Sequence, residues 1–134
     1  MPIDLLDVPG DLRPAAAAAL QAARVVDGHL SVELVSASRI RELNRQHRGL
    51  DEATDVLSFP IDGSDSVAGP RELGDVVICP EHAANLQQAT VHAVLHLCGY
   101  DHEIDDGQML GLQAAVMRSI RPLNEGPAGT GQRR

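Results

Sequence analysis

Three histidines stand close together in the stretch HAVLHLCGYDH, residues 92–102. His92 and His96 are four residues apart, so on one α-helix their rings would differ by about 40° in direction and could reach one metal ion. Gly99 would let the chain leave that helix in a left-handed conformation and bring His102 to a third coordination position. Three neutral imidazoles and a water are typical of an open, catalytic zinc site. We therefore predict one zinc ion per chain, bound by His92, His96 and His102.

Ala93 separates this pattern from that of zinc peptidases, whose H-E-x-x-H-x-x-G-x-x-H motif spaces its ligands in the same way. Those enzymes use the Glu after the first His as a general base, and an alanine side chain cannot accept a proton. Zinc still lowers the pKa of a water and polarises a carbonyl or phosphoryl oxygen, which favours hydrolysis in general. Ordinary peptidase chemistry is therefore disfavoured.

The composition limits how the chain can bind a polyanion. Its 134 residues carry a formal net charge of −8, so binding to nucleic acid requires a local basic patch. With one Phe, one Tyr and no Trp, the chain offers almost no aromatic platform for stacked bases. The sequence shows no export signal and no apolar run long enough for a membrane span, which predicts a cytoplasmic protein without a membrane partner. In the cytoplasm Cys79 and Cys98 should stay reduced, and we expect both to be small, buried apolar side chains.

The hydrophobic pattern predicts one domain over residues 1–121 and a disordered C-terminal tail over residues 122–134. A helix that begins at Pro80 should carry the histidines, and Gly99 should end it. A last helix should bury one apolar face after residue 107. The other expected elements are strands at residues 3–6, 29–35, 54–60 and 74–80, and helices at residues 13–26 and 36–49.

Three blocks of the sequence resemble the YbeY family of bacterial metal-dependent endoribonucleases. HAVLHLCGYDH matches the family's H-G-x-L-H-L-x-G-Y-D-H at every fixed place except Ala93, where the family usually has Gly. LNRQHRGLDEATDVLSFP is similar to the family's L-N-x-x-Y-R-x-x-D-x-P-T-D-V-L-S-F-P, with His47 at the Tyr place and Ala53 at the Pro place. LGDVVIC is the third block, and the three cover residues 43–102 in the family's order.

The resemblance implies an α+β fold in which helices pack on a mixed four-stranded sheet and one helix carries the metal-binding histidines. The family's ligands correspond to His92, His96 and His102, and its phosphate-binding Arg corresponds to Arg48. The catalytic residues would then be Arg48, His92 and His96. Arg41 and Arg45 lie on the same helical stripe as Arg48, which by itself is typical of a solvated helix face. The resemblance implies that these two residues widen a basic path for the substrate.

The implied activity is zinc-dependent cleavage of single-stranded RNA, in maturation of the 16S ribosomal RNA 3′ end and in ribosome quality control. A ribosome or a small-subunit ribosomal protein would be the partner, and DNA is not an expected substrate. The attacking group could be a water or the ribose 2′-OH. Two alternatives stay open: a zinc peptidase or amidase, and a ribosome-associated binding protein with weak catalysis. The second alternative is motivated by the segment before the metal helix, which is shorter than is usual in the family.

We predict that His92→Ala, His96→Ala and His102→Ala each lose zinc, because two remaining imidazoles make a poor site. Metal analysis of each purified variant tests this, and the melting temperature should fall together with the metal content. Full zinc occupancy in any one variant would remove that histidine from the set of ligands.

Overall fold

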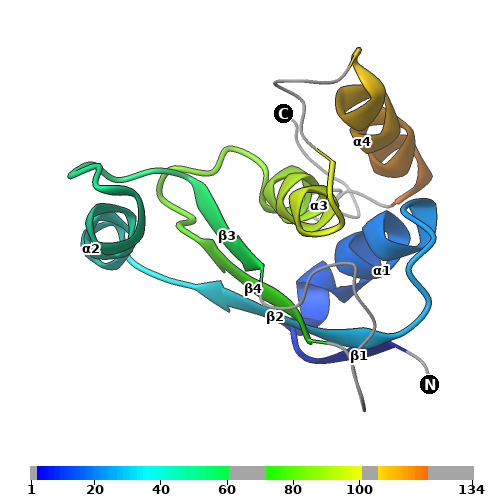
Figure 1. Cartoon of the computed structure of the whole chain (residues 1–134), viewed down its shortest axis with the longest axis horizontal. Helices are drawn as coiled ribbons and strands as arrows, with labels where there is room; N and C mark the ends of the chain where they lie inside the picture. Colours follow the sequence, from blue (N-terminus) through cyan, green and yellow to red (C-terminus); the bar gives the residue numbers. More distant parts are fainter. Residues whose placement is uncertain (1–2, 61–71, 101–105, 121–134) are drawn as a thin grey trace, which may run out of the picture.

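The computed structural model describes residues 3–60, 72–100 and 106–120 (Figure 1). Its strands and helices follow the order expected from the hydrophobic pattern. They are β1 (Ile3–Asp7), the short 3-10 helix η1 (Gly10–Leu12), α1 (Arg13–Ala22), β2 (Gly28–Leu34), α2 (Ala37–Arg48), β3 (Val56–Pro60), β4 (Glu72–Ile78), α3 (Leu86–Leu97) and α4 (Gln108–Ser119).

The four strands form one mixed sheet in the order β1-β2-β4-β3. β1 pairs with β2 and β2 pairs with β4 in parallel, whereas β3 runs antiparallel to β4. The α+β class and the mixed four-stranded sheet are therefore confirmed.

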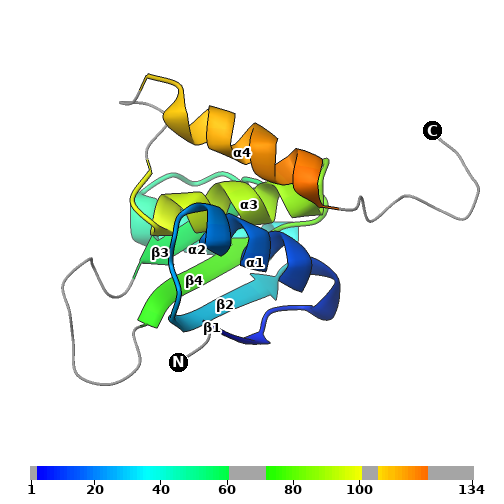
Figure 2. The same ribbon diagram turned by 90° about the vertical axis from the view of Figure 1, so that its right-hand side faces the viewer.

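Helices cover the two faces of this sheet unequally (Figures 1 and 2). α1 and α3 pack against each other on one face, and α4 lies on both of them as a further layer. α2 lies on the other side of the sheet, beside β3. Along β4, Val76 and Ile78 join the larger core below α1 and α3, while Val77 and Cys79 join a smaller core with Ile40 of α2. This alternation follows from the two-residue period of side chains in a strand.

The start of α3 differs from our expectation. We predicted a helix from Pro80, but α3 begins at Leu86. The His82 amide bonds the Cys79 carbonyl in a turn at 3.0 Å, and the Asn85 side chain accepts a hydrogen bond from the Gln88 amide at 3.0 Å. Asn85 is thus the N-cap, and this cap satisfies a donor that the first helical turn leaves unpaired.

Gly74 of β4 allows α3 and β3 to approach the strand closely. Its φ of +146° lies in the region that disfavours L side chains, and an added Cβ would lie 2.5 Å from the Phe59 carbonyl oxygen and 2.9 Å from Leu97 Cδ2. A glycine is therefore needed where the end of α3 crosses the sheet.

Several expectations concern segments outside the described residues. His102 lies in 101–105 and the tail of residues 122–134 lies in 121–134, so both stay predictions, as does the single domain over residues 1–121. Within the described ranges, the helices lack the combined length and apolarity that a bilayer span requires. Cys79 is buried and Cys98 half-buried, as expected for small apolar side chains, and their reduced state stays a prediction.

His29 of β2 lies between two carboxylates from the neighbouring strands. Its Nδ1 is 2.9 Å from Glu72 Oε1 of β4, and its Nε2 is 2.7 Å from Asp7 Oδ2 of β1. The hydrogen bond to Glu72, followed by that to Asp7, raises the pKa of His29 above its ordinary 6.5. When both ring nitrogens donate, the charged imidazole ties three strands together at one end of the sheet.

We predict that the free energy of unfolding falls as the pH rises through the pKa of folded His29. Folding raises this pKa, so the stabilisation is fully present below about pH 6.5 and is lost at higher pH. Urea unfolding of the wild type and of His29→Gln, between about pH 6 and pH 9, measures the effect because glutamine does not titrate. An equally steep decline in both proteins would contradict the assignment.

Candidate active site

α3 places His92 and His96 on one exposed edge of an otherwise buried helix. Val91, Val94 and Leu95 are fully buried in the main core, so the two histidines, which are half-buried, point away from it. Their ring centroids are 4.8 Å apart, with an interplanar angle of 74°. The four-residue spacing therefore brings the two imidazoles together as predicted.

The end of α3 directs the chain toward the predicted third ligand. Gly99 has a φ of +102°, and the Tyr100 amide bonds the Leu95 carbonyl at 3.1 Å. This is the left-handed helix termination expected at Gly99. His102 follows in the segment outside the described residues, and the described part of the chain contains no cluster of three possible metal ligands.

The paired imidazoles nevertheless fit a zinc ion chemically. Zinc accepts neutral imidazole nitrogen, and catalytic sites combine three protein ligands with one open position. His92 and His96 also face an open cleft, which would give a bound metal access to substrate. His102 stays our prediction for the third ligand.

The cleft lies between α3, β3 and the end of α2, and its volume is about 630 Å³. That volume falls within the range of about 300–1,000 Å³ that is common for ligand pockets. Its lining combines imidazoles, a guanidinium, a carboxylate and two hydroxyls with apolar side chains. The lining residues are His47, Arg48, Thr54, Asp55, Val56, Leu57, Ser58, Phe59, His92, Ala93 and His96.

Arg48 and His47 enter this cleft from the last turn of α2. Arg48 is the last residue of the helix and lines the same hollow as His92 and His96. The His47 ring packs on Phe59 of β3, with centroids 4.8 Å apart. We did not predict a role for His47, although its place in the family motif, where a Tyr is usual, was an available signal.

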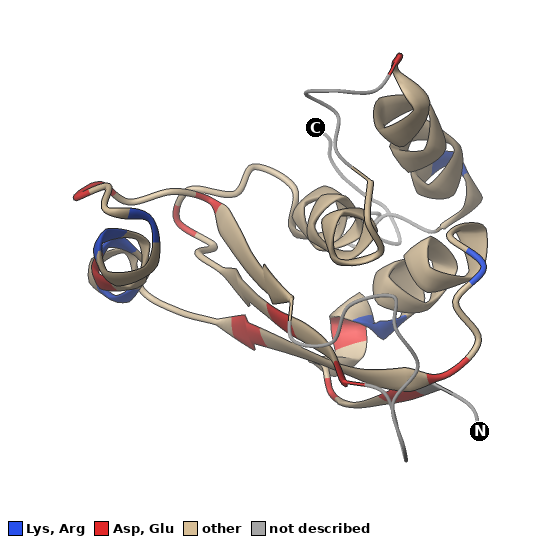
Figure 3. Cartoon of the chain, viewed as in Figure 1, with Lys and Arg blue, Asp and Glu red and all other residues tan. Residues whose placement is uncertain are grey.

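Arg41 and Arg45 do not line the cleft with Arg48. The Arg41 guanidinium donates two hydrogen bonds of 2.8 and 3.2 Å to Asp51, and this hydrogen bonding, followed by the Arg41 charge, lowers the pKa of that carboxyl. Figure 3 shows that positive residues gather on α2, whereas acidic residues are spread over the strands and loops. α2 therefore forms a local basic region in an acidic chain, and Arg48 is the arginine of this helix that lines the cleft.

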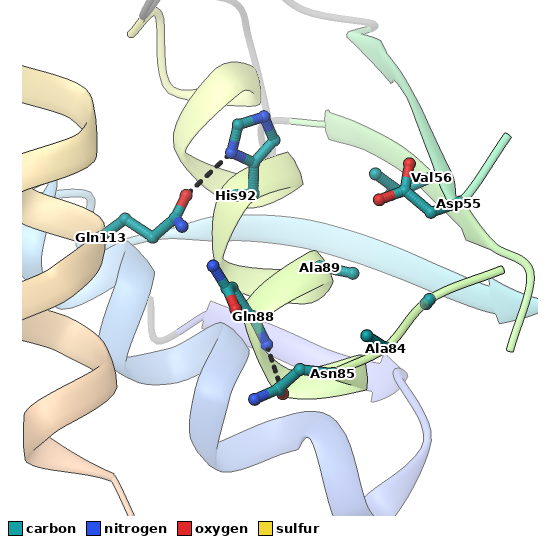
Figure 4. Close-up of a pocket in the computed structure, with 9 residues that line it drawn as sticks. Asp55, Val56, Ala84, Asn85, Gln88, Ala89, His92 and Gln113 are labelled. Atoms are coloured by element: carbon teal, nitrogen blue, oxygen red, sulfur yellow. Dashed lines mark hydrogen bonds between the residues drawn. The ribbon is translucent and has the colours of Figure 1, made fainter.

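A smaller hollow of about 250 Å³ adjoins the cleft and shares Asp55, Val56 and His92 with it. Its polar side chains include Asn85 and Gln88 from the start of α3 and Gln113 from α4. In Figure 4, Asp55 lies across the hollow from His92 and Gln113. Sequence reasoning assigned no role to Asp55 or Gln113, because neither belongs to a histidine pattern.

These elements define an α+β protein whose cleft brings two imidazoles suited to a metal ion together with an arginine suited to a phosphate group. A sequence model described as "Endoribonuclease YbeY" matches residues 11–121. The chain therefore belongs to the YbeY endoribonuclease family, whose members are metal-dependent hydrolases.

Individual relatives agree with this assignment. The chain is 43% identical over 114 residues to the "Endoribonuclease YbeY" of Streptomyces coelicolor, and the match covers 69% of each chain. It is 38% identical over 139 residues to that of Limosilactobacillus fermentum, which covers 84% of this chain and 88% of the relative. The solution structure of a Thermotoga maritima protein matches with a TM-score of 0.50 and 31% identity, covering 81% of this chain and 79% of the other.

We predict that Ala93→Glu, which restores the peptidase motif in sequence, gains no peptidase activity and lowers the melting temperature. Ala93 is only 1% exposed, so the new carboxylate would be partly buried, and a general base must also lie within reach of the reacting water. Casein cleavage and thermal unfolding measure the two effects, with Ala93→Gly as the control. Robust casein cleavage by Ala93→Glu would show that the cleft accepts a peptide.

Proposed function

We propose that the protein is a zinc-dependent endoribonuclease that cleaves phosphodiesters of single-stranded RNA in the cleft beside α3. The observation that carries this proposal is that Arg48 lines the same hollow as His92 and His96, although more than forty positions separate it from them in the sequence. A phosphate bound by Arg48 would then lie within the cleft that the imidazoles face. Membership of an endoribonuclease family supports RNA as the substrate.

His92 and His96, together with His102, would hold the zinc ion. Zinc in such a site supplies a Lewis acid that polarises a phosphoryl oxygen and lowers the pKa of a water to about 7. The half-buried imidazoles would hold the ion at the wall of the cleft. Ala93 takes no part in proton transfer.

Arg48 would bind the scissile phosphate. Its guanidinium can donate two parallel hydrogen bonds to phosphate oxygens, and its charge opposes the negative charge that grows in the transition state. Thr54 and Ser58, both half-buried in the cleft wall, offer hydroxyl groups for further contacts with phosphate or sugar. Arg45 and Arg41, outside the cleft on the same helix, would attract more distant phosphates of the strand.

The proposal covers two nucleophiles, which give different products. Attack by water leaves a linear phosphate on one of the two RNA ends. Attack by the ribose 2′-OH leaves a 2′,3′-cyclic phosphate and needs no water in the bond-breaking step. Mass spectrometry of the fragments from one short RNA therefore identifies the nucleophile, and a substrate with a 2′-deoxy sugar at the scissile position gives an independent check.

We further propose that the substrate is ribosomal RNA, at the 3′ end of the 16S molecule, and that the protein acts in ribosome quality control in the cytoplasm. The net charge of −8 opposes capture of a free polyanion, so a ribosome or a small-subunit ribosomal protein would deliver the RNA. The same net charge opposes binding of a long DNA duplex, so DNA is not an expected substrate.

Two alternatives are separated from this proposal by one assay. Zinc-loaded protein is incubated with ribosomal RNA and, separately, with casein. RNA cleavage that a chelator abolishes supports the endoribonuclease, and casein cleavage supports a peptidase or amidase. Cleavage of neither substrate, together with binding to ribosomes, supports a binding protein that has lost catalysis.

We predict that Arg48→Glu lowers RNA cleavage by about 100-fold or more, because a negative charge would oppose the phosphate where a cation had bound it. Zinc content and the melting temperature should stay near the wild-type values, since an exposed charge at a helix end contributes little stability. A cleavage assay on one single-stranded RNA measures the effect, and zinc is determined on each preparation.

Arg45→Ala is the matched control on the same helix. It should lower cleavage only mildly, and its defect should shrink at high salt, because salt screens a peripheral electrostatic contact. Cleavage near the wild-type rate by Arg48→Glu would overturn the role of Arg48. Loss of zinc in Arg48→Glu would mean that Arg48 maintains the site rather than binding the phosphate.

A further inference from the structure

Gln113 of α4 makes a hydrogen bond to a predicted metal ligand. Its Oε1 lies 2.8 Å from Nδ1 of His92, and the two side chains meet at the edge of the smaller hollow (Figure 4). Gln113 is buried, with 8% of its surface exposed. It also lies outside the three motif blocks of residues 43–102, so the sequence patterns assign it no function.

The chemistry of this contact selects one form of the His92 ring. A carbonyl oxygen can only accept a hydrogen bond, so Nδ1 of His92 must carry the proton. In the neutral ring the lone pair is then at Nε2, and a metal ion binds a neutral imidazole through such a lone pair. Gln113 thus favours the tautomer that can bind a metal through Nε2, and its hydrogen bond also restricts rotation of the ring.

The position of Gln113 is itself fixed by packing. Met109 and Val116, one helical turn to either side of Gln113 on α4, are buried in the main core, and α4 packs on both α1 and α3. The amide therefore reaches His92 from a helix that cannot rotate without exposing these apolar side chains. The sequence alone does not reveal the contact, because 21 positions separate its two residues.

We propose that Gln113 is a positioning residue that holds His92 in the orientation and tautomer required for metal binding. The inference rests on the proposed function only in taking His92 as a metal ligand. It adds a dependence of metal affinity on α4, a helix that carries no predicted ligand. Groups that bond the distal nitrogen of a metal-binding histidine typically change metal affinity by about 10–100-fold when they are removed.

The direct test is the tautomer of His92 in metal-free protein, read from the nitrogen chemical shifts of its ring by NMR above the pH at which the ring is charged. The wild type should have the proton on Nδ1. Gln113→Met, which keeps the size of the side chain but removes the strong acceptor, should shift the population toward the Nε2-protonated form that predominates in water. Gln113→Glu keeps an acceptor and should retain the proton on Nδ1.

Zinc affinity, measured by competition with a chelator, supplies the second readout. Gln113→Met should weaken binding by about 10–100-fold, and Gln113→Glu should restore it to within a few-fold of the wild type. Gln87→Met is the matched control, because Gln87 is a buried glutamine of α3 that lines neither hollow. This control should change the melting temperature without changing zinc affinity or the His92 tautomer.

A wild-type His92 protonated on Nε2 would overturn the proposal, and this result does not depend on any variant folding. Unchanged zinc affinity in folded Gln113→Met would overturn it as well. Failure of the proposed function gives a different result. In that case the wild type itself would bind no zinc or cleave no RNA, while the tautomer would still report the contact between Gln113 and His92.

Discussion

Burial of one side of α3 is the constraint on which the rest of the site depends. Val91, Val94 and Leu95 are removed from water by the sheet and by α1, so the helix cannot turn about its axis without exposing them. The direction of His92 and His96 is a consequence of that packing. Gly74 allows α3 to lie this close to β4, since any side chain at that position would collide with Phe59 and Leu97.

The other cleft wall comes from parts of the chain with a different structural origin. α2 belongs to the smaller core on the far side of the sheet and reaches the cleft only through its last turn, where Arg48 lies. β3 runs antiparallel to the rest of the sheet. The cleft wall includes Ser58 of β3 and, just before this strand, Thr54 and Asp55. The arginine and the imidazoles are therefore carried by separate elements that the same sheet holds in place. This arrangement would allow the proposed phosphate binding by Arg48 to be altered without loss of the imidazole pair.

Local patterns in the sequence predicted the elements and the histidine pair well. The four-residue spacing of His92 and His96 and the left-handed turn at Gly99 are both properties of nearby residues. The start of α3 was predicted wrongly, because proline is common at the first position of a helix and Pro80 was taken for that position. The Asn85 cap and the turn before it determine where the helix begins.

Contacts between distant residues could not be predicted in this way. The bond from Gln113 to His92 and the packing of His47 on Phe59 depend on how α4 and β3 lie against their neighbours. The pairing of Arg41 with Asp51 depends on the path of the loop after α2. Arg48 was predicted for the cleft from the family motif, because the periodicity of α2 alone does not distinguish it from a solvated arginine.

The zinc ion proposed for His92 and His96 would lie on the side of α3 that faces Arg48. Anomalous X-ray diffraction at the zinc absorption edge, from crystals of protein purified without added metal, tests this most directly. We expect one strong peak per chain, about 2.0–2.1 Å from a ring nitrogen of each of the two histidines and open to the cleft. A peak at the sulfur of Cys79 or Cys98, or at any position remote from both rings, would contradict the account.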